Sequence, residues 1–169
     1  MNKLNIGCGK RKRKDCINID KEQVDLNKFP YPFKDNTFSH IYANNVLEHL
    51  DNLIDVFNEL YRISKDNTII EVTSPFWLHP TSNNMTHTKN NVSVDWFKPI
   101  LDNNPDGERF RYQEIKGKFN LIRYEYIPSI KLPNFFVNRF ANLIPCLVVA
   151  IKHYIKVKKP TQIKTIQKD

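Results

Sequence analysis

The sequence predicts an α/β fold, built on an open, mostly parallel β-sheet with helices on both faces. Short apolar segments bounded by Gly, Asp or Asn recur through the first half of the chain, as buried parallel strands do. One such segment is followed by an amphipathic helix and then by another, and a strand–helix–strand unit of this kind is right-handed and parallel. The chain has 169 residues, 40% hydrophobic and 26% charged, so we expect a single globular domain over residues 1–159.

The first two predicted strands are short and close together in the sequence. Leu4–Ile6 and Ile17–Ile19 are apolar and partly β-branched, and only residues 7–16 join them. A parallel crossover that contains a full helix needs at least about 10–12 residues. We therefore expect the usual crossover helix to be reduced to a turn or absent. Val24–Leu26 is predicted as a short edge strand before the proline-rich loop FPYPFKDN.

The clearest helix is predicted over Asp51–Ser64, with Asp51 as its N-cap. A strand is predicted on either side of this helix, Ser39–Ala43 before it and Thr68–Thr73 after it. The apolar residues of the helix recur at helical spacing on one face: Leu53, Ile54, Phe57, Leu60 and Tyr61.

The second half of the chain is predicted to complete the sheet. A short helix is expected at Val94–Leu101, within a segment rich in Pro, Asn and Thr. Lys118–Tyr126 and Val148–Val157 have strand character and are expected to pair with each other. The last residues, 160–169, are expected to form a disordered basic tail.

The composition argues against several classes of protein. The three cysteines, Cys8, Cys16 and Cys146, are odd in number and lack metal-ligand spacing, so neither a disulfide framework nor a metal site is expected. No signal peptide is recognised, and the uncharged run Phe140–Ile151 is shorter than the roughly 20 residues that a bilayer span needs. A cytoplasmic location is therefore expected. The formal charge of +8 favours acidic partners.

A glycine-rich turn and an acidic residue follow the first two predicted strands. The first strand ends in Ile-Gly-Cys-Gly, residues 6–9, and Asp20 directly follows the second strand. Glycines here let the backbone approach a ligand, and Asp20 is placed to accept hydrogen bonds from a ribose diol. A dinucleotide site would need a third glycine where Lys12 stands, a following helix and a later acid. That reading is rejected.

The segment resembles motif I of the class I S-adenosylmethionine-dependent methyltransferases, which here reads LNIGCG. The resemblance continues in order through INID at 17–20, the segment 24–50 with its LEH sequence, and the helix and strand over 51–76. It is similar above all to a compact subgroup that lacks a full first helix. Two positions depart from the family pattern, since Arg11 replaces the third glycine and Asp15 replaces a glycine before the second strand. The implied fold is Rossmann-like, in a reduced form.

The resemblance implies an enzyme that binds S-adenosylmethionine without a metal. Its glycine turn would approach the cofactor, Asp20 would hold the ribose and Asp25 would lie by the adenine. Leu47 is expected to pack on the adenine or methionine part. The full set of cofactor-binding residues predicted in this way is Gly7, Cys8, Gly9, Asp20, Asp25, Leu26, Asn45 and Leu47.

Three histidines are candidates for a general base that removes a proton from the acceptor. His49 follows the fourth strand of the resembled fold, and is equally read as a residue of a first helical turn. His79 and His87 lie after the next strand, where THTK at 86–89 partly matches a family motif. A structural role is the alternative for each of them.

The run Lys10–Lys14 (KRKRK) lies between two core strands, so we interpret it as a loop at the rim of the cofactor site or a solvated turn. The expected function is methyl transfer to a small-molecule or sugar-type acceptor. Three alternatives remain open: a nucleic-acid or protein methyltransferase that uses the basic loop and tail, a non-catalytic binding protein, and peripheral membrane contact through residues 135–155. The oligomeric state is not predicted.

Overall fold

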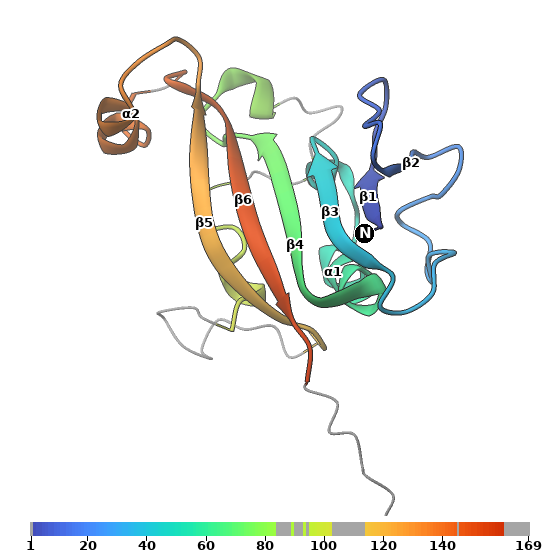
Figure 1. Ribbon diagram of the computed structural model, residues 1–169. Helices are drawn as coiled ribbons and strands as arrows, with labels where there is room; N and C mark the ends of the chain where they lie inside the picture. The colour runs from blue at the N-terminus through green and yellow to red at the C-terminus, as the bar shows by residue number, and fades with distance from the viewer. Residues whose placement is uncertain are drawn as a thin grey trace, which may run out of the picture.

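The computed structural model describes residues 2–83, 89, 93, 95–102, 114–144 and 146–160. These residues form a six-stranded sheet with the order β2-β1-β3-β4-β6-β5 (Figure 1). The strands β1 to β4 pair in parallel, and β6 is antiparallel to both β4 and β5. The predicted α/β class with a mostly parallel sheet is confirmed. The strand bounds are β1 Lys3–Ile6, β2 Ile17–Ile19, β3 Phe38–Asn44, β4 Ser64–Pro75, β5 Lys118–Pro128 and β6 Val148–Lys158.

The predicted central helix is α1, Leu53–Ile63, but its N-cap is Asn52 and not Asp51. Asn52 has an extended backbone, and its side-chain oxygen accepts a hydrogen bond from the Asp55 N–H at 3.2 Å, which satisfies a free donor of the first turn. The expectation for Asp51 was wrong because the helix begins one residue later. A second helix, α2, and three 3-10 turns complete the described elements: α2 Asn134–Phe140, η1 Leu47–His49, η2 Pro80–Asn83 and η3 Lys98–Ile100.

The main core lies between α1 and one face of the sheet. Paired residues of four neighbouring strands form a buried apolar row on this face: Leu4, Ile41, Ile70 and Ile155. Phe57 of α1 packs edge-on against Phe97 and Phe119, with ring centroids 5.7 and 5.6 Å away. These contacts fix where α1 begins, at the carboxyl edge of the sheet.

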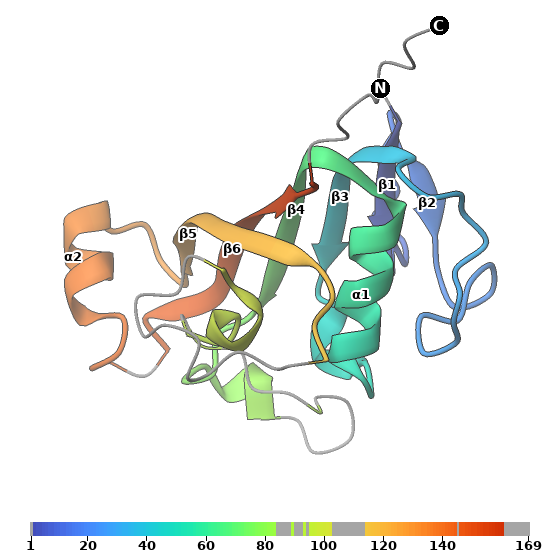
Figure 2. The same cartoon turned by 90° about the horizontal axis from the view of Figure 1, so that it is seen from below.

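The opposite face of the sheet is polar and is not covered by a helix within the described parts of the chain. Figure 2 shows α1 on one side of the sheet only, and Figure 1 looks onto the uncovered face. This differs from the expected helices on both faces, because residues 7–16 and 20–37, which precede β2 and β3, are loops. A row of paired residues crosses this open face: Asn18, Asn5, Tyr42, Glu71, Tyr154 and Arg123.

Two other predictions differ from the structure. Val24–Leu26 is a loop, because the Tyr31 hydroxyl bonds the Leu26 carbonyl at 2.9 Å and no strand pairs with this segment. Of Val94–Leu101, only Lys98–Ile100 is helical, as a 3-10 turn, and residue 94 lies outside the described residues.

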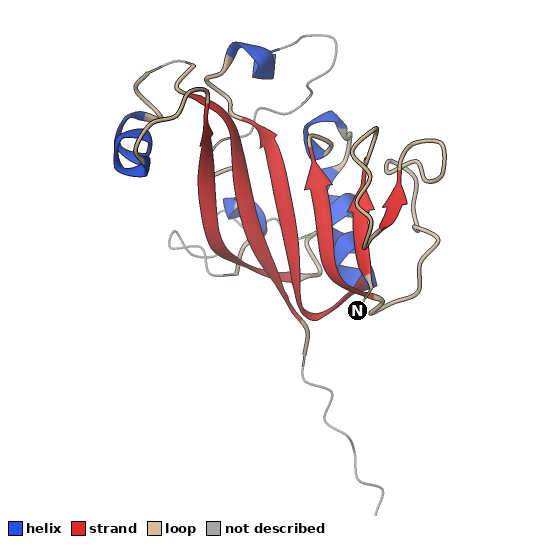
Figure 3. Cartoon of the chain, turned by 45° about the horizontal axis from the view of Figure 1, so that its top comes forward, coloured by secondary structure: helices blue, strands red, loops and turns tan. Residues whose placement is uncertain are grey.

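The predicted pairing of the last two strands is confirmed. The predicted tail lies outside the described residues beyond Pro160. Figure 3 shows α2, which the sequence did not predict, beyond the end of β5.

Candidate functional site

The turn after β1 requires glycine at position 7, both for its backbone conformation and for lack of space around it. Gly7 has a φ of +57°, and a Cβ atom there would lie 2.4 Å from Cγ2 of Val46. Gly9 has a φ of +47°, but its Cβ would meet only Asp20, at 3.9 Å. Within the described residues, Arg11 and Asp15 are not among those with positive φ. The loop therefore does not need glycine at the two positions where the sequence departs from the family pattern.

The carboxylate of Asp20 faces the glycine turn. One of its oxygens accepts a hydrogen bond from the Gly9 N–H at 3.0 Å, and the other accepts from the Lys21 N–H at 2.9 Å. Each carboxylate oxygen has a further lone pair available, and hydroxyl groups are suitable donors for it. The two bonds hold the Asp20 carboxylate beside the glycine turn.

A cavity of about 310 Å³ lies between the ends of β1, β2 and β3. It brings together five residues that the sequence singled out, Gly7, Asp20, Asp25, Leu26 and His49. Leu26 is held in place by the hydroxyl of the buried Tyr31. The structure adds six lining residues that the sequence analysis missed: Lys21, Val24, Asn27, Val46, Leu50 and Lys89. Val46 lies three residues after the predicted third strand, and its side chain has no chemistry that would have indicated a site.

The other four residues predicted to bind the cofactor lie outside the lining of this cavity. Cys8 is buried and lines an adjoining cavity of about 290 Å³, which also contacts Gly7. Gly9 acts through its hydrogen bond to Asp20. Asn45 has a φ of +51° and lies on the side of the open face. Leu47 is fully buried in the core beneath the site.

The basic loop is fixed against the sheet. The Asn5 side chain, 3% exposed as a residue, donates to the Arg11 carbonyl at 3.1 Å. Asn18 accepts from the Arg13 N–H and donates to the Arg13 carbonyl, both at 2.8 Å. Arg11, Lys12 and Arg13 line the 290 Å³ cavity beside Gly7 and Cys8. The loop thus lies beside the candidate site, which agrees with its interpretation as a rim loop.

The three candidate histidines occupy different places. His49 lines the 310 Å³ cavity, with its side chain 42% exposed and its Nε2 4.0 Å from Oε1 of Glu48. His79 directly precedes the turn η2, and its carbonyl accepts a hydrogen bond from the Ser82 hydroxyl at 2.7 Å. It does not line the 310 Å³ cavity. His87 lies outside the described residues.

Glu48 is a buried carboxyl group that the sequence analysis did not assign. It is 1% exposed, and one of its oxygens accepts a hydrogen bond from the Ser74 hydroxyl at 3.2 Å. Burial raises the pKa of Glu48 above its usual 4.5, although His49 and the Ser74 bond act in the opposite direction. Removing a charge from water is costly, so the buried Glu48 carboxyl is harder to ionise in the folded state than in the unfolded chain.

The free energy of unfolding of Glu48→Gln is expected to increase relative to that of the wild type as the pH rises. The pKa of Glu48 is higher in the folded state than in the unfolded chain. Protonated Glu48 therefore favours folding at a pH below its pKa in the unfolded chain, and this contribution is lost as the pH rises past its pKa in the folded state. Glutamine keeps a polar partner for Ser74 without this loss. Urea unfolding of both proteins at about pH 5 and about pH 8 measures the difference. A gap between them that does not change with pH would contradict the prediction.

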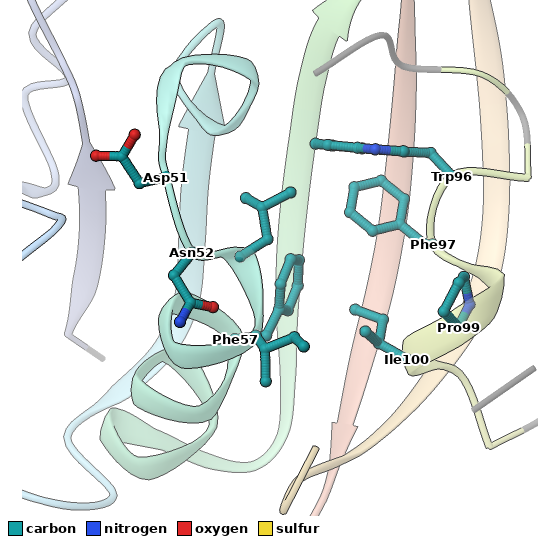
Figure 4. A pocket seen from close by; sticks show the side chains of 9 residues that line it. Asp51, Asn52, Phe57, Trp96, Phe97, Pro99 and Ile100 are labelled. Atoms are coloured by element: carbon teal, nitrogen blue, oxygen red, sulfur yellow. The ribbon is translucent and has the colours of Figure 1, made fainter. Parts of the chain in front are cut away.

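A separate apolar groove of about 370 Å³ lies between the start of α1 and the segment 95–100. Figure 4 shows Asp51, Asn52 and Phe57 on one side and Trp96, Phe97 and Ile100 on the other. Phe97 is a core residue at 3% exposure, while Trp96 is half-buried on the groove wall. Trp77 is 41% exposed and does not line the groove. Asp51 of this groove forms an ion pair with Lys89, which lines the 310 Å³ cavity.

Residues 135–155 were considered in the sequence analysis as a surface for peripheral membrane contact. Residues 135–155 divide into an exposed apolar part, with Phe135 and Leu143 at 76% and 66% exposure, and the strand β6. Peripheral membrane contact stays a prediction for the first part alone. No helix in the described parts of the chain is both long and apolar enough to cross a membrane. The described residues contain no group of three or more His, Cys, Asp or Glu side chains that is arranged to hold a metal ion.

Comparisons with known proteins agree with this geometry. Residues 4–71 match the family model of the methyltransferase domain. The fold is similar to that of a SAM-dependent methyltransferase from Archaeoglobus fulgidus, at 15% identity and a TM-score of 0.59, over 93% of this chain and 86% of that one. It is also similar to that of an S-adenosylmethionine-dependent methyltransferase from Mesorhizobium loti, at 6% identity and a TM-score of 0.56. The match covers 92% of this chain and 90% of that one. No curated protein sequence matches the chain.

The methyltransferase family model covers residues 4–71, and the fold of the chain is that of S-adenosylmethionine-dependent methyltransferases. The matched residues 4–71 contain the glycine turn, Asp20 and the sequence around His49. They therefore include most of the residues that line the 310 Å³ cavity. The two similar structures are those of methyltransferases that depend on S-adenosylmethionine.

Proposed function

We propose that the protein transfers the methyl group of S-adenosylmethionine to a small-molecule or sugar-type acceptor. The observation that carries this proposal is the size of the cavities at the carboxyl edge. The 310 and 290 Å³ cavities meet at Gly7, and their volumes are those of sites for small ligands. In open α/β sheets, this edge is where ligands bind.

The residues of the 310 Å³ cavity fit the adenosine part of the cofactor. Asp20 offers carboxylate lone pairs to the ribose hydroxyls, and Gly7 leaves room where a side chain would collide with Val46. Asp25 and the buried Leu26 line the side expected to receive the adenine. The cofactor supplies a methyl group on a sulfonium, which is already a good leaving group. The chain's own contribution is to hold the acceptor in line and keep it there.

His49 is the described histidine best placed to accept the acceptor's proton. It lies at the cavity and remains 42% exposed, so an incoming group can reach it. A general base must come within hydrogen-bond reach of the proton it removes. His79 does not meet this condition in the cavity, and His87 lies outside the described residues. We assign the base to His49 as part of the proposal.

The acceptor class is tested by following a labelled methyl group. The protein is incubated with methyl-labelled S-adenosylmethionine and three separate acceptor pools: deproteinised metabolites, total RNA and total protein. We expect label in the metabolite pool and none in the other two. Label in RNA or protein would replace the proposal with the corresponding alternative. Cofactor binding with no label in any pool would favour the non-catalytic alternative.

A further inference from the structure

A basic hollow of about 420 Å³ lies on the open face of the sheet, at its carboxyl edge. Its floor is formed by two rows of paired residues, Tyr42 with Glu71, and Asn44 with Thr73 and Lys152. Arg11 and Arg13 of the basic loop form one wall. The hollow exists because no helix covers this part of the sheet among the described residues.

The two arginines are held in position by the sheet. Both backbone carbonyls are hydrogen-bonded, that of Arg11 to Asn5 and that of Arg13 to Asn18. The Arg13 guanidinium lies over the Tyr42 ring, 3.7 Å from its centroid. A guanidinium stacked in this way still presents its N–H groups at the edge, where they bind oxyanions in forked pairs. The Arg13 side chain therefore needs little further ordering when an anion binds.

The charges of the hollow match a dianion. Three cations, Arg11, Arg13 and Lys152, face one carboxylate, Glu71, which leaves a net charge of +2. Lys152 pairs with Glu71 at 3.1 Å, and Arg13 is 3.9 Å from the same oxygen. A phosphate monoester carries about −1.5 to −2 at pH 7 and has three acceptor oxygens. A single carboxylate would balance only half of the positive charge.

The aromatic side chains here do not favour nucleobases. Single-stranded nucleic acids are bound by aromatic rings that are free to stack with bases. The Tyr42 ring is covered by Arg13 and has His40 at 4.3 Å, and the Tyr154 ring is covered by Arg123 at 4.3 Å. The chain's own cations therefore occupy the stacking positions. The hollow suits a small phosphorylated ligand better than a strand of RNA.

The hollow is connected to the cofactor cavity through shared lining residues. It shares Arg11, Arg13 and Asn44 with the 290 Å³ cavity, which in turn shares Gly7 with the cofactor cavity. Asn45 of the hollow directly precedes Val46 of the cofactor cavity. A ligand anchored in the hollow is therefore next to the region where methyl transfer would take place.

We propose that the hollow binds the phosphate monoester of a small acceptor, so that the substrate is a phosphorylated small molecule such as a sugar phosphate. This inference rests on the proposed function and names its substrate class. It also gives the basic loop a role, since Arg11 and Arg13 would bind the acceptor's phosphate. The cofactor would be held by other residues, in the 310 Å³ cavity.

The test measures phosphate binding directly, by titrating the whole protein with inorganic phosphate, glucose 6-phosphate, glucose and acetate. We expect saturable binding of the two phosphates only. Arg13→Gln and Lys152→Gln should each weaken it at least about tenfold, as expected for loss of a charge-assisted hydrogen bond. Glu71→Gln should tighten it, because it removes the opposing charge. Arg123→Gln is the matched control, since Arg123 also stacks on a tyrosine of this face but does not line the hollow.

Titration of S-adenosylmethionine into the same variants separates this inference from the proposed function. Unchanged cofactor binding in Arg13→Gln shows that the variant is folded and that Arg13 serves another ligand. Cofactor binding without phosphate binding, or phosphate binding that Arg13→Gln and Lys152→Gln leave intact, would overturn the inference alone. Equal binding of acetate would overturn the assignment to phosphate. Tight, strongly salt-dependent binding of an oligoribonucleotide, with none of inorganic phosphate, would assign the face to nucleic acid.

Discussion

Asp20→Ala is expected to weaken the binding of S-adenosylmethionine and S-adenosylhomocysteine by about 100-fold or more. Hydrogen bonds to a charged group contribute about 1.5–3 kcal/mol each, and two ribose hydroxyls would lose such a partner. The variant also loses the bond from the Gly9 N–H, which holds the turn after β1. Calorimetric titration of both ligands into the wild type and the variant measures the loss.

Two further variants show whether the effect belongs to the carboxylate. Asp20→Asn keeps the size of the side chain and removes the charge, so it should lie between the wild type and Asp20→Ala. Glu22→Ala changes an exposed acid two residues away that does not line the cavity, and should bind normally. If Asp20→Ala binds both ligands as tightly as the wild type, the assignment of Asp20 to the ribose is wrong.

Gly7→Ala is expected to destabilise the protein by about 2–5 kcal/mol and to abolish cofactor binding. Forcing a methyl group into a packed site costs about 1–3 kcal/mol, and a left-handed backbone adds about 1–2 kcal/mol for a non-glycine residue. At Gly7 both apply, since the new Cβ would lie 2.4 Å from a Val46 methyl group and φ is +57°. Val46 lines the cofactor cavity, so any shift that relieves the contact also changes that cavity.

Gly9→Ala is the matched comparison for Gly7→Ala. Its φ is +47°, but the space around it is open, so only the backbone cost of about 1–2 kcal/mol is expected. Urea unfolding of the two variants measures the difference between them. Equal destabilisation would show that the contact with Val46 can relax at no cost.

The sequence was informative about the sheet because its strands have strong local signals. The strands β1, β2, β5 and β6 lie within two residues of their predicted bounds, since short apolar or β-branched runs such as LNI and INI favour strands when turn residues bound them. Strand β4 begins four residues before its prediction, because Ser64 already pairs with Phe38 beyond an irregularity in the ladder. That pairing depends on a distant strand, and no local pattern could have indicated it.

The candidate site could be predicted only in part, for a physical reason. Gly7, Asp20 and Asp25 were found because a turn glycine and an acid after a strand have a recognisable chemistry. Val46, Lys21 and Asn27 have ordinary side chains and line the cavity only because the chain folds past it. The basic hollow also could not be predicted from the sequence, since it joins a loop near residue 12 to a strand near residue 152.

The position of β6 has a consequence for how the protein is made. This last strand lies between β4 and β5, so β5 has no partner in the sheet until β6 has been synthesised. A nascent or truncated chain that ends before residue 148 exposes the edge of β4 together with an unpaired β5. Unpaired strand edges are templates for aggregation. A chain truncated before residue 148 should therefore be much less soluble than a chain that contains β6.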